Sequence, residues 1–141
     1  YIMDNKPFKV LGVEHIGIAS NNLDGINHIF SDIFGLDLIG REKVLDQKVI
    51  TDIYNAIDTK LEFLKAIDLT SPISKFLENN KSGIHHIALK VDKLKEALEY
   101  LEKKGIVLID KKPRIGAEGL SIAFIHPKST GGILVELCES K

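Results

Sequence analysis

Cysteine, tryptophan and long apolar runs are scarce or absent in this sequence. Its 141 residues include one cysteine, Cys138, and no tryptophan. A single cysteine excludes an internal disulfide, and the chain shows neither a signal-peptide pattern nor an apolar run long enough to span a bilayer. We therefore expect a cytoplasmic protein with no membrane partner.

Neither sign of charge is in excess. The 19 basic and 20 acidic side chains give a formal net charge of -1 at pH 7, and the basic residues form no long block. This balance argues against nucleic acid or an anionic membrane as the main partner, and favours a small molecule or another protein. The length and the 44% hydrophobic content suit one compact domain, or two small halves that share a core.

A phrase that occurs twice is the main feature that the sequence does contain. The runs GVEHIGIAS and GIHHIALKV each place a histidine, His15 or His86, just before an isoleucine in a strand-like segment. Each is followed by a helical pattern and three β-like runs, so the chain reads as βαβββ twice. The offset is 71 residues between the histidines and 74 between Glu62 and Glu136, as expected for a duplicated unit.

Turn and cap signals give the expected elements. The first half predicts a strand over about 10–19, a helix from the cap Asn22 to near Gly35, and strands within 36–66 that break around Asp46 and Asp58. A linker helix begins after Ser71. The second half predicts a strand over 84–91, a helix from the cap Asp92 to Gly105, and strands over 106–110, 120–126 and 131–139.

Strand parity places one histidine and one glutamate of each half on the same sheet face. Side chains alternate across a strand, so His15 and His86 share their faces mostly with small residues, while large aliphatic residues point the other way. A carboxylate in an apolar run such as ILVELC is costly to bury unless a cation compensates it. If the halves associate by pseudo-twofold symmetry, His15, Glu62, His86 and Glu136 converge on one point.

Two imidazoles and two carboxylates are a ligand set for Co²⁺, Zn²⁺, Ni²⁺, Mn²⁺ or Fe²⁺, with one or two positions open to water or substrate. An open position is typical of a catalytic metal site. A strand histidine alone is more often structural than a ligand, and it is the matched positions in both halves that favour the metal. His28, His85 and His126 are expected to be structural or to lie outside the ligand shell, His85 because it points away from His86.

Longer stretches of the chain resemble a known family. EHIGIA, HHIALKV and GGILVELCE are similar to the vicinal oxygen chelate superfamily, which includes glyoxalases, bleomycin resistance proteins and dioxygenases. The runs SPISKFLENNKSGIHHIALKVD, PRIGAEGLSIAFIHPKSTGG and DQKV resemble its methylmalonyl-CoA epimerase family. The resemblance covers nearly the whole chain, and FIHPKSTGG is its most specific part.

The resemblance implies a fold and a metal site. It implies one α+β domain over residues 1–141, in which two tandem βαβββ modules form a half-barrel around one divalent metal ion, as in the glyoxalase fold. The first module covers about 9–67, the linker helix about 70–82 and the second module about 83–139. By the same resemblance His15, His86 and Glu136 bind the metal, with Glu62 at the fourth ligand position, where the family often has glutamine.

The resemblance also implies a reaction. It implies an isomerase that epimerises methylmalonyl-CoA at C2, by removing a proton and returning it to the opposite face through a metal-stabilised enolate. Glu136 and Asp46 are the candidate proton carriers. Asp46, in DQKV, matches an acidic loop residue of the family, and Lys48 stands where the family has glycine.

The partners follow from the same resemblance. An acyl-CoA is the expected substrate, and Lys60, Lys112 and Arg114 are candidates to meet the CoA phosphates, although each is more often a solvated surface charge. The family resemblance also favours a homodimer.

Three other functions use the same residues or the same fold. Glyoxalase I (lactoylglutathione lyase) has a glutamate at the position of Glu62, which keeps it as the main alternative. An Fe(II) dioxygenase could use His15, His86 and Glu136 as a facial triad. A drug-binding protein of the bleomycin-resistance type would need an aromatic-lined groove, and only 6% of these residues are aromatic.

Overall fold

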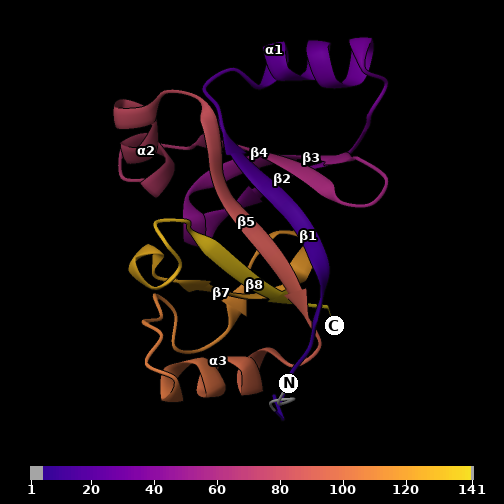
Figure 1. Ribbon diagram of the computed structural model, residues 1–141. Coiled ribbons are helices and arrows are strands. Elements are labelled where there is room, and N and C mark those ends of the chain that lie inside the picture. The colour runs from indigo at the N-terminus through magenta and orange to yellow at the C-terminus, as the bar shows by residue number, and fades with distance from the viewer. Residues whose placement is uncertain (1–4, 141) are drawn as a thin grey trace. The chain divides into compact units, whose positions relative to one another are not determined.

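The computed structural model describes residues 5–140 (Figure 1). The chain divides into two compact units, residues 15–86 and residues 1–14 together with 87–141. The module boundaries expected from the sequence, about 9–67 and 83–139, stay a prediction. Between residues 5 and 140, none of the helices has the length and apolar character needed to cross a bilayer.

The unit formed by residues 15–86 contains a sheet of the order β2-β3-β4-β1. Its strands are β1 (Val10–Ala19, of which residues 15–19 pair here), β2 (Asp37–Val44), β3 (Val49–Asn55) and β4 (Lys60–Ala66). Its helical segments are α1 (Leu23–Asn27), the π-helical turn η1 (His28–Ile33), the 3-10 turn η2 (Leu45–Gln47) and α2 (Pro72–Asn80). β4 pairs parallel with β1 and antiparallel with β3, which pairs antiparallel with β2.

The helix side of this sheet buries an aromatic core. Asn22 caps α1 by accepting a hydrogen bond from the backbone N–H of Gly25 at 2.9 Å. The helix thereby starts at Leu23, which packs in one cluster with Tyr54 of β3 and Phe63 of β4. The predicted cap is confirmed, but the predicted helix to near Gly35 is only partly so, because α1 ends at Asn27 and the π-helical turn η1 continues to Ile33.

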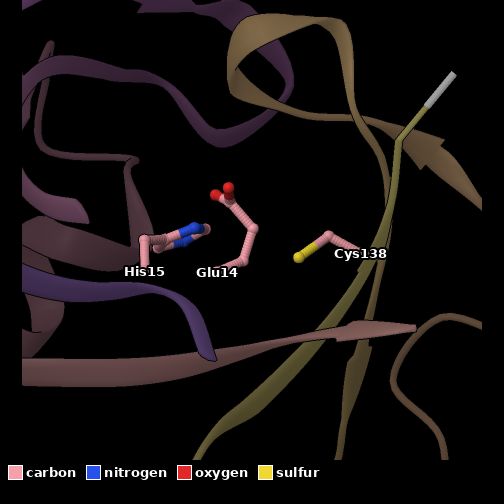
Figure 2. A group of neighbouring side chains, drawn as sticks. All are labelled: Glu14, His15 and Cys138. Atoms are coloured by element: carbon pink, nitrogen blue, oxygen red, sulfur yellow. The ribbon is translucent and has the colours of Figure 1, made fainter. Parts of the chain in front are cut away.

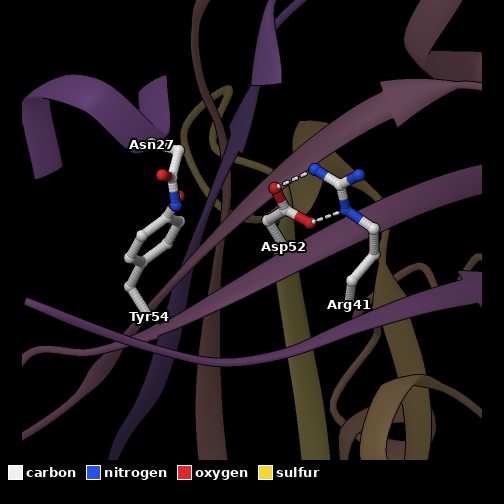
Figure 3. Close-up of polar contacts among 4 residues, drawn as sticks. All are labelled: Asn27, Arg41, Asp52 and Tyr54. Atoms are coloured by element: carbon white, nitrogen blue, oxygen red, sulfur yellow. Dashed lines mark hydrogen bonds and ion pairs between the residues drawn. The ribbon is translucent and has the colours of Figure 1, made fainter. Parts of the chain in front are cut away.

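Two buried polar side chains of β3, Asp52 and Tyr54, have hydrogen-bond partners (Figure 3). Asp52 is fully buried and accepts hydrogen bonds from Nε and Nη2 of Arg41 at 2.6 and 2.8 Å. The Asn27 amide donates to the buried Tyr54 hydroxyl at 3.0 Å, which ties the end of α1 to β3. These contacts matter because a buried carboxylate or hydroxyl without a partner is costly.

The second unit contains a sheet of the order β5-β8-β7-β6. Its elements are β5 (Gly83–Val91, with residues 87–90 pairing here), α3 (Leu94–Lys103), β6 (Arg114–Ile115), the 3-10 turn η3 (Ala117–Gly119), β7 (Ser121–Ile125), the 3-10 turn η4 (Pro127–Ser129) and β8 (Val135–Glu139). The helix α3 lies along β7 and β8 (Figure 1). Leu94, Ala97 and Leu98 of α3 join one core cluster with Ala123 and Leu137.

The two halves repeat one pairing pattern. β1 pairs parallel with β4, and β5 pairs parallel with β8, while the strands between them pair antiparallel. In each half the first strand therefore lies beside the last. The βαβββ repeat expected from the sequence is confirmed in its strand pairing.

Two local predictions of the second half are wrong. Residues 106–110 form no regular strand, although an isolated bridge joins Leu108 to Ile125 and the backbone N–H groups of Ile109 and Asp110 both donate to the Phe124 carbonyl. The side chain of Asp110 accepts a hydrogen bond from the Phe124 N–H at 2.9 Å, in the place of a backbone acceptor. Asp92 does not cap α3, because its carboxylate instead accepts a hydrogen bond from the backbone N–H of Lys9 at 2.7 Å.

Candidate functional site

Burial alternates along β1 and β5 as strand parity predicts. His15, Gly17 and Ala19 are buried, whereas Ile16 and Ile18 between them are only half-buried. On β5 the same alternation buries His86. The two histidines therefore lie on the face that the sequence assigned to them.

Three of the four predicted ligands meet within the unit of residues 15–86. The Nε2 atoms of His15 and His86 are 3.1 Å apart, and their rings are nearly perpendicular, at 88°. Nδ1 of His15 lies 2.9 Å from Oε2 of Glu62. His15, Glu62 and His86 are only 4%, 4% and 3% exposed. The parallel register explains the contact, because Gly17 is paired with Glu62 and β4 thus carries Glu62 alongside β1.

Gly17 provides the space for the ring of His86. A Cβ atom added at Gly17 would lie 2.1 Å from Cε1 and 2.4 Å from Nδ1 of His86. These separations are far below van der Waals contact, so only glycine allows the ring to lie here. The small residue that the sequence places beside His15 is therefore a requirement of the histidine pair.

His85 contacts His86, which the sequence did not predict. The Nδ1 atoms of the two rings are 2.9 Å apart. Phe76 of α2 packs edge-on against His85, with the ring centroids 5.0 Å apart. Strand parity assigned His85 to the opposite face, but its imidazole still reaches the ring of its neighbour.

Burial sets the protonation of these rings. Desolvation lowers the pKa of His86 well below its ordinary value, and the nearby His15 and His85 lower it further. Desolvation also lowers the pKa of His85. His86 is therefore neutral at pH 7, and the neutral imidazole is the form that binds metal ions.

Glu136 belongs to the other unit. It lies on β8, is 3% exposed, and is paired in register with Ala88 of β5 and with Phe124 of β7. Its carboxylate is thus buried in the middle of the sheet of that unit. The sequence identified Glu136 by this same feature, a carboxylate inside an apolar run.

Glu14 is a second acidic residue near β8 that the sequence reasoning did not identify. Figure 2 shows Glu14 and Cys138 with His15, the residue that follows Glu14 on β1. The Glu14 carboxylate lies within 4.8 Å of the Cys138 thiol and also within 4.8 Å of the Glu118 carboxylate. Cys138 is buried, and its Sγ atom contacts the Leu89 carbonyl oxygen at 3.5 Å. The sequence feature that could have identified Glu14 is a carboxylate directly before His15 in an apolar strand.

Asp46, the second predicted proton carrier, lies on the turn between β2 and β3. Asp46 is exposed on η2, shortly before Val49, which pairs with Ala66, four residues beyond Glu62 on β4. At about 3.3 Å per residue, Ala66 lies about 13 Å from Glu62 along β4.

The three candidate basic residues differ in their surroundings. Lys60 is half-buried at the start of β4, and Lys112 is exposed. Arg114 is already engaged, because its Nε lies 3.2 Å from Oδ1 of Asp110 and its guanidinium lies 5.5 Å from the centroid of the Phe124 ring.

Comparison with known proteins identifies the family. The profile of the Glyoxalase/Bleomycin resistance protein/Dioxygenase superfamily matches residues 14–124. The chain belongs to this superfamily. Among the relatives of this chain, the mitochondrial methylmalonyl-CoA epimerase of Dictyostelium discoideum is 38% identical over 128 residues, which cover 90% of this chain and 77% of that protein. The uncharacterized protein YqjC of Bacillus subtilis is 40% identical over 129 residues, 92% of each chain.

Solved structures that are similar to this chain include methylmalonyl-CoA epimerases as well. The methylmalonyl-CoA epimerase from Mycobacterium tuberculosis matches with a TM-score of 0.91 at 29% identity, covering 100% of this chain and 94% of that one. A methylmalonyl-CoA epimerase in complex with methylmalonyl-CoA and NH4⁺ matches with a TM-score of 0.88 at 28% identity, covering 94% of this chain and 96% of that one. This chain is therefore an α+β enzyme of the isomerase class and is similar to methylmalonyl-CoA epimerases, as the sequence predicted.

The divalent metal that this superfamily implies fits the histidine pair. A cation needs several lone pairs directed at one point and ligands that are not protonated. Two buried imidazoles with their Nε2 atoms 3.1 Å apart, one of them kept neutral by burial, meet both conditions. His15 and His86 would hold the ion.

Proposed function

We propose that the chain epimerises methylmalonyl-CoA at C2 and uses one divalent metal ion to do so. The observation that carries this proposal is the 3.1 Å separation between the Nε2 atoms of His15 and His86, in residues that are 4% and 3% exposed. Metal–nitrogen bonds are about 2.1 Å long, so two ring nitrogens this close could both bind one ion. The two imidazoles thus have the spacing that one ion requires.

The proposed ligands are His15, Glu62, His86 and Glu136, and Oε2 of Glu62 lies 2.9 Å from Nδ1 of His15. Strand register supports Glu136. Ala88 follows His86 by two residues on the same face of β5, and it pairs with Glu136 on β8. Glu136 is therefore carried by the strand next to the one that bears His86. Co²⁺, Zn²⁺, Ni²⁺, Mn²⁺ and Fe²⁺ all suit two imidazoles with carboxylates.

Epimerisation at C2 requires two proton carriers, one on each side of the plane formed when the proton leaves. The metal, when bound, supplies positive charge that stabilises the negative charge developing on the acyl oxygens. We assign the proton transfers to Glu136 and Asp46. Glu136 is buried on a strand, whereas Asp46 is exposed on the η2 turn, so the two approach the acyl group from different elements.

The acyl-CoA would carry several negative charges on its phosphates. Lys60 and Lys112 are the proposed contacts, since both carry an ammonium group on long flexible side chains. Arg114 is a weaker candidate than the sequence suggested, because Asp110 already binds its guanidinium at 3.2 Å. Charge reversal at Lys112 should raise KM for the acyl-CoA without lowering kcat.

Exchange of the C2 proton with solvent tests the proposed reaction. The protein is stripped of metal with a chelator, reloaded with Co²⁺ and incubated with methylmalonyl-CoA in D₂O, and deuterium at C2 is followed by mass spectrometry. We expect rapid exchange that His86→Ala abolishes and that Asp46→Asn slows at least about 100-fold. The control is His28→Ala, which removes a histidine whose side chain is 66% exposed. The assay is repeated with Zn²⁺, Ni²⁺, Mn²⁺ and Fe²⁺ in place of Co²⁺, and absence of exchange with all five ions would overturn the proposal.

Glyoxalase I activity is the second candidate, because Glu62 provides a carboxylate beside His15 where the epimerases often have an amide. Turnover of the methylglyoxal–glutathione hemithioacetal without exchange of methylmalonyl-CoA would favour it. A dioxygenase would require iron, so full activity with Zn²⁺ would exclude that reaction. A non-catalytic drug-binding protein would show neither activity. The cytoplasmic location and the homodimer remain predictions.

A further inference from the structure

A small polar cavity lies on the helix side of the β2-β3-β4-β1 sheet. Its volume is about 190 Å³, and its lining consists of two basic residues, one acidic residue, two asparagines and two apolar residues: Asn21, Asn22, Leu23, Asp24, Arg41, Ile50 and Lys65. All of them belong to the unit of residues 15–86. Arg41 lies on β2, and Ile50 and Lys65 are paired in register on β3 and β4. The cavity is therefore built by three neighbouring strands and the start of α1.

Strand alternation places this cavity on the opposite face of the sheet from Glu62. On β4, Lys65 shares its face with Phe63, which packs in the aromatic core, whereas Glu62 points to the other face. On β3, Ile50 shares its face with Tyr54 of the same core. The cavity is therefore separate from Glu62, and none of its lining residues has a role in the proposed reaction.

A buried carboxylate fixes the orientation of Arg41. Nε and Nη2 of Arg41 donate to the two carboxylate oxygens of Asp52 at 2.6 and 2.8 Å. The Asp52 side chain is 0% exposed, whereas that of Arg41 is 53% exposed, so the pair extends from the interior to the surface. A buried ion pair seldom stabilises a fold more than apolar side chains of similar volume would. It does hold a guanidinium in one orientation, which favours the binding of a further anion.

The pair with Asp52 uses only part of the Arg41 guanidinium. Arginine has five N–H groups, and Asp52 accepts one from Nε and one from Nη2. Nη1 points away from Asp52 (Figure 3). The two N–H groups of Nη1 and the second N–H group of Nη2 therefore form an outer edge of the guanidinium. Two N–H groups in such a fork match two oxygens of a phosphate or carboxylate group.

The other donors of the lining favour phosphate over carboxylate. Lys65 adds a second cation, whose ammonium group has three N–H donors. Oδ1 of Asn22 already accepts from the Gly25 N–H at 2.9 Å, so the NH₂ group is the part of the Asn22 amide that can serve a ligand. A phosphate group has at least three acceptor oxygens for these donors and those of Arg41, whereas a carboxylate has two.

Asp24 is the acidic group of the lining. The hydrogen bond and the charge of Asp52 raise the pKa of Arg41, and the charge of Asp24 raises it further, so the guanidinium stays ionised. The lining still carries two cations against one carboxylate. Because Asp24 would repel an anion in the cavity, removal of its charge should strengthen the binding of an anion and weaken that of a cation.

We propose that the cavity binds a phosphate group, held by the outer edge of the Arg41 guanidinium and by the Lys65 ammonium group. Its volume of about 190 Å³ is below the roughly 300–1,000 Å³ of sites that enclose a drug-sized ligand. The cavity therefore accommodates one phosphate group, either free inorganic phosphate or the phosphate of an ester whose remainder lies in solvent. The inference is independent of the metal ion and of the proposed reaction.

An NMR titration tests the site at the level of one residue. Inorganic phosphate is added at pH 7 and constant ionic strength to the full chain, with and without one equivalent of Zn²⁺, and the Nε–H signal of Arg41 is followed. Arg41→Lys identifies this signal by its loss. We expect a saturable shift, and acetate should bind at least about 5-fold more weakly. No saturable shift up to about 20 mM phosphate, or equal affinity for acetate, would overturn the proposal.

Single substitutions separate the roles of the lining residues, with affinity measured from the backbone amide signal of Ile50. We expect phosphate affinity to fall about 10-fold in Arg41→Lys and about 2–5-fold in Lys65→Ala, and to rise about 2–5-fold in Asp24→Asn. Lys75→Ala is the control, because it removes an exposed lysine of α2 that does not line the cavity.

Lys65 and Asp24 are exposed, so their variants keep the test valid even if Arg41→Lys is poorly folded. Wild-type affinity in Lys65→Ala, or a lower affinity in Asp24→Asn, would contradict an anion site. A purely structural role of these residues would not change their affinities in opposite directions.

Two further ligands identify the source of the phosphate group. Glycerol 3-phosphate shows whether an ester binds as free phosphate does, and either result agrees with the proposal. Coenzyme A should leave the phosphate-induced shift of Ile50 unchanged, because Ile50 and Glu62 lie on opposite faces of the sheet. Displacement of phosphate by coenzyme A would overturn the separation of the cavity from the proposed substrate. Since the titration uses no methylmalonyl-CoA, phosphate binding without proton exchange refutes the proposed function alone, and exchange without phosphate binding refutes this inference alone.

Discussion

A single methyl group added at Gly17 should displace His86 and with it the proposed metal ion. In Gly17→Ala the new Cβ would lie 2.1 Å from Cε1 of His86, so the ring must move by about 1.3 Å to reach the 3.4 Å at which ordinary contact begins. The ring has little room for this movement, since it is 3% exposed and contacts His15 and His85. Overpacking of this kind costs about 1–3 kcal/mol.

The effect on metal binding should exceed the effect on stability. A displacement of about 1.3 Å takes Nε2 of His86 out of bonding range, so one of the proposed ligands is lost. We expect Co²⁺ affinity to fall more than about 100-fold, beyond the loss typical of a residue that contacts only a metal ligand. Competition with a chelator measures the affinity, and urea denaturation of the metal-free protein measures the stability.

Gly40→Ala is the matched control. A Cβ at Gly40 of β2 would meet no atom within 4 Å, so the stability and the Co²⁺ affinity should both remain close to those of the wild type. If Gly17→Ala binds Co²⁺ within about twofold of the wild type, the ring of His86 does not lie against Gly17. The argument for the histidine pair would then be refuted.

Three further predictions concern stability. Because the pKa of His86 is lowered in the folded protein, the unfolded chain binds more protons below pH 6.5. The free energy of unfolding of the metal-free protein should therefore fall as the pH drops from 7 to 5, by at most about 1.4 kcal/mol per pH unit for this group. Urea midpoints that do not change with pH would contradict this prediction. Arg41→Met leaves the fully buried Asp52 carboxylate without its partner, so it should cost about 2 kcal/mol or more by urea denaturation, and Arg41→Lys less. Lys48 has a left-handed backbone conformation, at φ 53°, which glycine adopts without strain and alanine does not. Both Lys48→Gly and Lys48→Ala lose the hydrogen bond from Nζ to Thr70, so Lys48→Gly should be about 1 kcal/mol more stable than Lys48→Ala. Equal melting temperatures of the two variants would contradict the backbone strain.

Strand alternation made most of the fold predictable from the sequence. The run over 10–19 alternates in size, and the observed strand is Val10–Ala19. The cap signals at Asn22 and Ser71 predicted two helix starts, because each side chain accepts a hydrogen bond from a backbone N–H at the start of its helix. The repeat predicted which histidines share a face, and within one unit the two rings are in contact. The predicted set of ligands and bases stays a prediction for the experiments above.

The sequence pattern could not predict the contacts in which a side chain takes the place of a backbone hydrogen-bond partner. The side chain of Asp110 accepts a hydrogen bond from the Phe124 N–H, where a regular ladder would have a backbone acceptor. Asp92 bonds to Lys9, which lies 83 residues away in the sequence. His85 was missed for a related reason, since parity describes where a strand side chain starts but not how far an imidazole reaches. Each of these contacts depends on a partner that local spacing does not specify.

The parallel pairing of β1 with β4 has a consequence for how this protein acquires its site. His15 pairs in register with Lys60, so the strand neighbours that bring His15 to Glu62 are separated by the whole of β2 and β3. His15 and His86 are 71 positions apart. Contacts this distant in sequence form slowly, because a long loop must close first. Capture of Co²⁺ during refolding should therefore report one of the last steps on the folding pathway.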